Sequence, residues 1–213
     1  MRYDADWQAN HRWTQQWSWG CFVTLLHLFE KPKTLPDMGC GEGHIPRGAL
    51  QLGIDALGSD MSIERPALAV FKADLTKPLR LSRISFDWVI SWEVAEHLPA
   101  SAADTYCESL ARHVGTFLFF TAATPGQGGD GHINEQPHAY WVEKLGKAGL
   151  ILKPEMTEMV RHAWEKIAGP CWWYPQNLRI FARRERQERS CEPSPPSISL
   201  GHYSYMAGCR QRS

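Results

Sequence analysis

The chain has 213 residues, of which 43% are hydrophobic and 22% are charged, and 23 Lys and Arg residues balance 23 Asp and Glu residues. This excludes a wholly disordered chain and predicts one main domain with short additions, because roughly 100–200 residues form one domain. The zero net charge provides no global attraction to nucleic acid or to an anionic membrane.

No apolar run approaches the ~18 residues needed to span a bilayer, and the first residues carry charges without a signal-type apolar stretch. The sequence therefore predicts a cytoplasmic protein with no membrane partner. The six cysteines are scattered without zinc-type spacing, so we expect free thiols and no metal site.

Residues 1–33 are expected to form a helical lead-in. Trp13, Trp17, Phe22 and Leu25 recur at helical spacing. Gly20 weakens the middle of this segment and is a candidate break between two helices.

From Thr34 onward, short apolar strands alternate with helices, which predicts a mostly parallel sheet covered on both faces. The expected strands are Thr34–Met38, Ile54–Ser59, Ala69–Ala73, Phe86–Ser91, Thr116–Thr121 and Leu178–Ala182, with a weaker one within Ile151–Met159. The expected helices are Ile45–Leu52, Ala100–His113 and Pro137–Ala148. Residues 34–185 would form the main domain, and the polar, Ser- and Pro-rich residues 186–213 predict a disordered tail.

A glycine-rich turn, Asp37-Met38-Gly39-Cys40-Gly41-Glu42-Gly43, lies between the first strand and a helix. Its glycines permit positive φ and let a ligand approach the backbone. The free N–H groups at the start of the helix favour an anionic group of that ligand. A surface loop without a ligand is the alternative, since three spaced glycines are a weak signal by themselves.

Acidic residues end the next two strands. In nucleotide-binding βαβ units, an acid at the position of Asp60 accepts hydrogen bonds from ribose hydroxyls. Asp74 could accept from an exocyclic amine, and Leu75 could pack on a flat base. A solvated loop carboxylate is the alternative for Asp60. Because strands of a parallel sheet present their carboxyl ends at one edge, the three acids together indicate one ligand site.

Three segments resemble the class I S-adenosylmethionine-dependent methyltransferases, in the small-molecule branch called type 11 or type 23. They are DMGCGEG at 37–43, FDWVISWEVAEHLP at 86–99 and GHINEQPHAYW at 131–141. The resemblance covers about residues 34–183. It implies a Rossmann-like three-layer α/β sandwich, with a seven-stranded, mostly parallel sheet whose last strand is antiparallel.

The resemblance also implies the cofactor S-adenosylmethionine and assigns its contacts. The turn would line the amino-acid end, Asp60 would hold the ribose, and the residues after the fourth strand would lie beside the methionine portion. The implied cofactor-binding residues are Asp37, Gly39, Cys40, Gly41, Gly43, Asp60, Asp74, Leu75, Trp92 and Glu93.

Two features depart from the family pattern. Pro36 stands directly before Asp37, where proline cannot donate to a sheet ladder, so the strand could end early or the turn could shift. The segment from Asp60 to Ala69 is short for a crossover helix, which predicts a bare turn.

Methyl transfer to a hydroxyl benefits from a base, and two histidines are candidates. His97 follows the fourth strand, although a helix-start histidine satisfied by backbone is the alternative. His132 lies in a glycine-rich loop after the fifth strand that we expect to act as a mobile flap, and Glu135 could orient it or hold substrate. Trp172, Trp173 and Tyr174 could wall an acceptor pocket or pack beneath the last strand.

The predicted function is S-adenosylmethionine-dependent methylation of a small molecule, with oxygen as the favoured nucleophile and a sugar or another metabolite as acceptor. Nucleic-acid methylation is a second possibility, opposed by the neutral charge and by the absence of an Asn/Asp-Pro-Pro-aromatic motif after the fourth strand. A non-catalytic module that keeps the fold for binding is the third. No oligomeric state is predicted.

Overall fold

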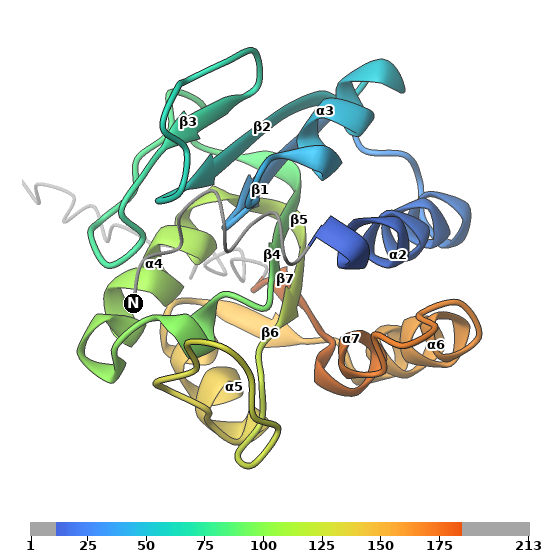
Figure 1. The fold of residues 1–213 in the computed structure, drawn as a ribbon. Helices are drawn as coiled ribbons and strands as arrows, with labels where there is room; N and C mark the ends of the chain where they lie inside the picture. Colours follow the sequence, from blue (N-terminus) through green and yellow to red (C-terminus); the bar gives the residue numbers. More distant parts are fainter. Residues whose placement is uncertain (1–11, 185–213) are drawn as a thin grey trace, which may run out of the picture.

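The computed structural model describes residues 12–184 (Figure 1), so the predicted tail at 186–213 lies outside the described residues. Residues 1–11 of the predicted helical lead-in likewise lie outside the described residues, which start with a short 3-10 helix, η1 (Arg12–Thr14), and continue as α2 (Gln15–Leu28). The strands are β1 (Thr34–Met38), β2 (Asp55–Asp60), β3 (Val70–Lys72), β4 (Phe86–Trp92), β5 (Val114–Thr121), β6 (Leu150–Leu152) and β7 (Arg179–Arg183). The remaining helices are α3 (His44–Gln51), η2 (Ala95–His97), η3 (Ala100–Ala102), α4 (Ala103–His113), α5 (His138–Lys147), α6 (Pro154–Glu165) and α7 (Trp173–Asn177).

The seven strands form one sheet in the order β3-β2-β1-β4-β5-β7-β6. Strand β7 is antiparallel to both of its neighbours, β5 and β6, and the pairings among the other strands are parallel. The chain order reverses direction at β1, where β2 lies on one side and β4 on the other. This confirms the predicted sheet and places a topological switch point beside β1, the position at which open α/β sheets bind ligands.

Helices cover both faces of the sheet, as Figure 1 shows. One core cluster joins α2, α3 and α6 to one face of the sheet, and a second joins α4 and α5 to the other. The lead-in belongs to the first cluster, because Cys21, Phe22 and Leu25 are fully buried there. The Trp164 Nε1–H of α6 also donates to the Cys21 carbonyl at 3.1 Å. The lead-in therefore packs directly on the domain core.

The predicted break at Gly20 is wrong, because α2 is continuous from Gln15 to Leu28. One glycine costs a helix only about 1 kcal/mol relative to alanine. Burial of the apolar face of α2 outweighs that cost, since tertiary packing supplies most of the stability of a helix in a protein.

The predicted first strand, Thr34–Met38, is confirmed, and β1 does not end early at Pro36. Its pairing with β2 covers all five residues, whereas its ladder with β4 is reduced to Asp37 opposite Ile90. Side-chain bonds support the start of that thin ladder. The Asp87 carboxylate accepts from the N–H groups of Lys33 (2.7 Å) and Thr34 (3.1 Å), and the Asp87 N–H donates to Thr34 Oγ1 (2.9 Å).

The chain between β2 and β3 contains no helix, which confirms the bare second crossover. The weaker strand predicted within 151–159 is present as β6, but it covers only Leu150–Leu152, and Pro154 then starts α6, a helix that was not predicted. Proline suits the first turn of a helix, where its missing N–H needs no partner. Met156, Val160 and Trp164 recur every fourth residue and pack into the core, which is the helical signal that the strand prediction overlooked.

Cys21, Cys40, Cys107 and Cys171 are buried free thiols, as expected for these four. None of the helices within residues 12–184 combines the length and the apolar character that crossing a membrane requires.

Candidate functional site

A cavity of about 550 Å³ opens at the carboxyl edge of the parallel strands. This volume lies within the range of about 300–1,000 Å³ found for small-molecule sites. Its walls come from the loops after β1, β2, β3, β4 and β5, from the start of α7 and from the first described residues. All the predicted site residues line it except Gly43 and Glu135, which lie behind the wall.

Two glycines of the turn pack closely against core side chains. Gly39 has φ +95°, and a Cβ there would lie 2.2 Å from Val94 Cγ2. Gly43, with φ +83°, precedes α3, and its Cβ would lie 2.3 Å from Val70 Cγ1. Side chains at these positions would therefore displace the turn from the sheet edge, so Gly39 and Gly43 keep the turn close to the core.

Asp60 is bound to the glycine turn. Its Oδ2 accepts from the Gly41 N–H at 2.9 Å, and its Oδ1 accepts from the N–H (2.8 Å) and the hydroxyl (2.7 Å) of Ser62. A solvated loop carboxylate would lack these contacts. Asp60 therefore joins the ends of β1 and β2 into one structural unit on the cavity wall.

Asp37 ends β1 as a buried carboxyl, with 4% of its surface exposed. Burial, with a smaller contribution from the charge of Asp60, raises its pKa to about 8. The group is consequently protonated at neutral pH until a cation or a hydrogen-bond donor stabilises the carboxylate.

Asp74 and Leu75 form the far wall of the cavity, beyond β3. Asp74 Oδ1 accepts from the Thr76 N–H at 2.9 Å and from its hydroxyl at 2.6 Å, and these bonds lower the Asp74 pKa. Leu75 is buried beside it. An ionised acceptor next to an apolar surface suits a flat ring that carries an amine.

Glu93 begins the loop after β4 in a rare conformation, with φ +53°. Its carboxylate accepts from Asn177 Nδ2 at 3.0 and 3.2 Å and from Gln127 Nε2 at 3.4 Å. Burial raises the Glu93 pKa, while these donors oppose the shift. Residues in such strained backbone persist where the surroundings hold them, and they cluster at functional sites.

Trp92 is the last residue of β4, directly before this loop, and is 8% exposed. Its ring meets the Trp164 ring edge-on at 5.1 Å between centroids. Its Nε1 is buried without a hydrogen-bond partner among residues 12–184. Trp172, Trp173 and Tyr174 extend this aromatic wall around the cavity, and Trp172 keeps 51% of its surface exposed.

The glycine-rich loop after β5 closes over the turn that carries His97. The N–H groups of Ile133 and Asn134 donate to the Glu96 carbonyl at 2.9 and 3.0 Å. Glu135 accepts from the N–H groups of Gly126 (2.8 Å) and Gly128 (2.7 Å), and so holds the loop in shape. Its role in the structure is thus to organise the loop from behind the cavity wall.

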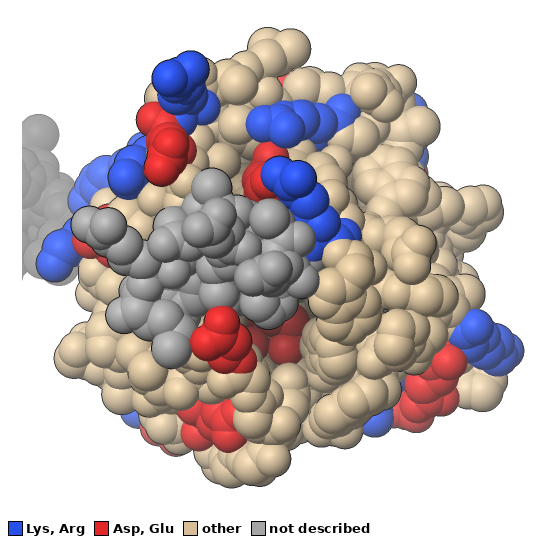
Figure 2. Space-filling view, in the orientation of Figure 1, with Lys and Arg blue, Asp and Glu red and all other residues tan. Residues whose placement is uncertain are grey.

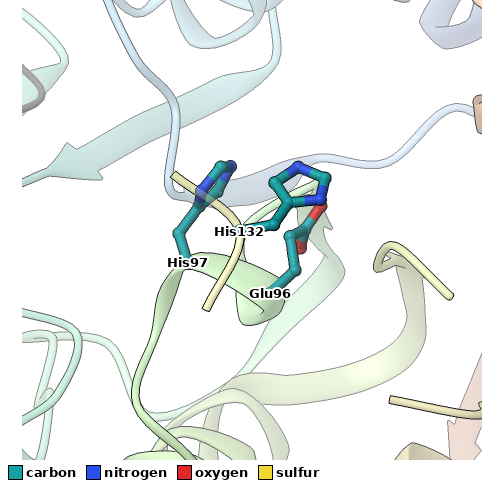
Figure 3. Close-up of side chains that lie close together, drawn as sticks. All are labelled: Glu96, His97 and His132. Atoms are coloured by element: carbon teal, nitrogen blue, oxygen red, sulfur yellow. The ribbon is translucent and has the colours of Figure 1, made fainter. Parts of the chain in front are cut away.

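His97 and His132 meet at the cavity wall, with ring centroids 4.9 Å apart (Figure 3). His97 Nδ1 lies 3.2 Å from the Gly131 carbonyl, and His132 Nδ1 lies 2.9 Å from Glu135 Oε1. Both acceptors select the tautomer with hydrogen on Nδ1 and the lone pair on Nε2. Burial lowers the His97 pKa to about 4, so this ring is neutral at physiological pH.

The sequence reasoning assigned no role to Glu96, Asn177, Ser18 or His44. Glu96 is fully buried beneath the two histidines, and its pKa is raised by burial and by the charge of Glu93. Asn177 reaches Glu93 from α7, and Ser18 Oγ lies 2.7 Å from His44 Nε2 at the cavity rim. No local pattern marks Asn177, Ser18 or His44, because each contacts a residue distant in the sequence. Glu96 lies three residues after Glu93 and directly before His97, and this spacing is the local signal that could have found it.

The sequence matches no model of a known protein family and no curated protein. Solved structures do match. The TehB-like S-adenosylmethionine-dependent methyltransferase from Corynebacterium glutamicum is 18% identical, with a TM-score of 0.53 over 78% of this chain and 88% of that one. Magnesium protoporphyrin IX methyltransferase from Synechocystis, crystallised with S-adenosylhomocysteine, is 18% identical, with a TM-score of 0.55 over 80% and 83%.

The sugar N-methyltransferase KedS8 from Streptoalloteichus is 17% identical, with a TM-score of 0.56 over 79% of this chain and 87% of that one. The chain thus has the fold of the class I S-adenosylmethionine-dependent methyltransferases, as the sequence resemblance implied.

Proposed function

We propose that this chain is an S-adenosylmethionine-dependent methyltransferase that acts on a small molecule. One observation carries the proposal. The glycine turn, Asp60 and Asp74 converge on one cavity at the carboxyl edge of a sheet whose fold is shared with such enzymes. One structural neighbour was crystallised with S-adenosylhomocysteine, the product of methyl transfer from this cofactor.

The cofactor would lie along the sheet edge. Asp60 is placed to accept from the ribose hydroxyls, and Asp74 with Leu75 would frame the adenine. The cationic amino-acid end and the sulfonium would lie toward Asp37 and Glu93, both of which line the cavity. A cation there would favour the ionised form of Asp37, which opposes the effect of its burial.

The chemistry is an in-line displacement. An acceptor oxygen attacks the methyl carbon, the carbon–sulfur bond breaks with its electron pair remaining on sulfur, and S-adenosylhomocysteine leaves. Alignment of the two bound reactants supplies about 7–11 kcal/mol of the barrier reduction. The hydroxyl proton passes to Nε2 of His97 or His132, a base contribution of typically ~10²–10⁴-fold. Glu135 orients His132 through Nδ1.

A metabolite with several hydroxyl groups fits the acceptor side of the cavity. His132 and the exposed Trp172 line that side and combine hydrogen-bonding and flat apolar surfaces. Two structural neighbours are described as a sugar N-methyltransferase and a porphyrin methyltransferase, so the shared fold accommodates both polar and flat acceptors.

Nucleic-acid methylation is the weaker alternative. Lys and Arg side chains in Figure 2 alternate with Asp and Glu side chains over the visible face, and the net charge of the chain is zero. A nucleic-acid site normally shows a basic stripe or patch.

Isothermal titration calorimetry with S-adenosylmethionine and S-adenosylhomocysteine tests the proposal. We expect binding by the unaltered chain, and at least tenfold weaker binding by Asp60→Ala, which loses the ribose acceptor and leaves the Gly41 N–H without its partner. Asp104→Ala is the matched control, because this carboxylate lies on the surface in an ion pair with Lys144.

A screen of candidate acceptors, read by release of S-adenosylhomocysteine, then identifies the substrate. Absence of cofactor binding at millimolar concentration would support the non-catalytic module instead. Unchanged turnover in His132→Ala would remove that residue from the proposed bases.

A further inference from the structure

Three side chains that can bind a metal converge on the acceptor side of the cavity. Glu96, His97 and His132 each offer one ligand atom, and these atoms lie within 4.8 Å of one another. Figure 3 shows the two imidazoles and the carboxylate side by side, at the point where the loop after β5 meets the turn after β4. Nitrogen and oxygen ligands lie ~2.0–2.2 Å from a bound transition-metal ion. Small side-chain rotations would let all three ligand atoms reach one ion at that distance.

Glu96 supplies a second, independent observation. Its side chain is 0% exposed, and neither carboxylate oxygen makes a hydrogen bond of good geometry within residues 12–184. The groups that interact with it are a second buried carboxyl, Glu93, and the backbone of Ala123. Two buried carboxyl groups beside each other are costly when ionised, and a cation at this point would compensate their charge.

The outer contacts of the histidines are those of metal ligands. A ligating histidine almost always donates its other ring N–H to a carbonyl or a carboxylate, which fixes the tautomer and the ring orientation. Here the Gly131 carbonyl faces His97 Nδ1, and Glu135 Oε1 faces His132 Nδ1. Glu135 is held in turn by the N–H groups of Gly126 and Gly128.

We propose that Glu96, His97 and His132 bind one divalent transition-metal cation of the class Mn²⁺, Co²⁺ or Zn²⁺. Two imidazoles and one carboxylate suit these ions, and three protein ligands leave coordination positions open. The open positions would face the cavity, since both histidines line it.

The metal site itself is independent of the proposed function, but its role in methyl transfer rests on that function. A cation at this point would bind an acceptor oxygen directly and favour its ionised form. His97 and His132 would then act as ligands instead of bases. The metal would also select acceptors that present a hydroxyl or carboxylate oxygen, which narrows the substrate class.

The test uses Co²⁺ alone, titrated into tag-free, full-length protein and followed by visible absorption and calorimetry. We expect one Co²⁺ per chain, with the visible bands of nitrogen and oxygen coordination. Glu96→Gln keeps the volume of the side chain and removes the charge, and we expect at least tenfold weaker binding. Glu135→Gln removes the charge of the outer contact of His132 and weakens the bonds to the Gly126 and Gly128 N–H groups, and we expect binding about 10–100-fold weaker.

His162→Ala is the matched control, because His162 also lies three residues from a glutamate, 3.7 Å away, but is exposed on α6. Its Co²⁺ affinity should equal that of the unaltered chain. Thermal unfolding in parallel shows whether each variant is folded, and Co²⁺ should raise the melting temperature of the unaltered chain but not that of Glu96→Gln.

Undetectable Co²⁺ binding at millimolar concentration, equal affinity in folded Glu96→Gln, or a thiolate-to-cobalt band that shows cysteine ligation would overturn the metal site. Calorimetry with S-adenosylmethionine on the same samples separates the two proposals. Cofactor binding without Co²⁺ binding refutes the metal site alone, and Co²⁺ binding without cofactor binding refutes the proposed function alone.

Discussion

At the scale of single residues, the cavity depends on positions where a side chain cannot be tolerated. Gly39 has φ +95°, and a Cβ added at this position would lie 2.2 Å from Val94 Cγ2. Left-handed backbone is strained for residues with a Cβ, and Val94 belongs to the buried core, so it has little freedom to move. The turn and the core beneath it are therefore coupled.

Gly39→Ala should abolish detectable S-adenosylmethionine binding and lower the free energy of unfolding by about 1–3 kcal/mol, because the turn must shift or Val94 must repack. Calorimetry and urea unfolding measure the two effects. The control is Gly146→Ala on α5, where a Cβ would meet no atom within 4 Å, and where alanine should stabilise the helix by about 0.5–1 kcal/mol. Normal cofactor binding by Gly39→Ala would contradict the role given to the turn.

Glu93 and Asp60 show how strongly residue roles depend on partners. The position of Asp60 at the cavity was predictable, because an acidic residue at the end of the second strand is recognisable in the sequence. Its bonds to Gly41 and Ser62 are seen only in the structure. The contact of Asn177 with Glu93 was not predictable, since the two residues are 84 positions apart.

At the scale of elements, β1 is held by side chains where proline weakens its ladder. The Asp87 carboxylate accepts from the N–H groups of Lys33, directly before β1, and Thr34, its first residue. These two donors therefore have an acceptor without the β4 backbone. A proline thus stands in this central strand, whose start is held by an acidic side chain from the neighbouring strand.

Asp87→Ala should lower the free energy of unfolding by about 1–3 kcal/mol, because it leaves two backbone donors without their acceptor. Urea unfolding measures the change. Asp55→Ala serves as control, since its carboxylate lies in an exposed ion pair with Arg83, a type worth about 0–1 kcal/mol. Equal losses in the two variants would show that the Asp87 contacts do not support the strand.

Element prediction succeeded where the pattern was local and failed where packing decided. Strands β1 and β4 follow from apolar runs bounded by turns. Helix α6 was overlooked because the segment that contains its first turn, 151–159, was predicted to contain a strand. The spacing of Met156, Val160 and Trp164, every fourth residue, was not recognised as helical. The continuity of α2 through Gly20 could not be inferred, because it depends on packing against α6.

At the scale of the whole molecule, burial concentrates carboxyl groups with raised pKa values around one cavity. Asp37, Glu93 and Glu96 all shift in this direction, mainly because the folded protein removes them from water. For these three groups the folded chain holds protons that the unfolded chain releases, so their contribution to the free energy of unfolding falls as the pH rises.

For Asp37 the interval runs from the ordinary pKa of 3.8 to about 8. Below pH 3.8 the carboxyl is protonated in both the folded and the unfolded state, so it does not affect stability. Between pH 3.8 and about 8 it ionises only in the unfolded state, and the folded state becomes progressively less favoured. Asp37→Asn removes this loss and should be more stable than the unaltered chain near pH 8, by an amount on the order of a few kcal/mol. Urea unfolding over that pH range measures it. A constant difference between the two chains at every pH would contradict the assignment.

The sequence by itself determined the strand–turn–helix around Gly39 to Gly43 and the acidic residue that ends the second strand. Glycine conformational preference and apolar periodicity act over a few neighbouring residues, and for that reason they can be recognised without a structure. The family resemblance implied a seven-stranded, mostly parallel sheet with an antiparallel last strand, and the structure confirms it.

Which groups meet at the wall of the cavity depends on the folded chain. Glu96 and His97 meet His132 because the loop after β5 folds back and its N–H groups bind the Glu96 carbonyl. Burial of the Glu96 carboxylate is a property of the whole core and not of its neighbours in the chain. Desolvation and side-chain convergence depend on every element that packs around a site, so they appear only once the chain has folded.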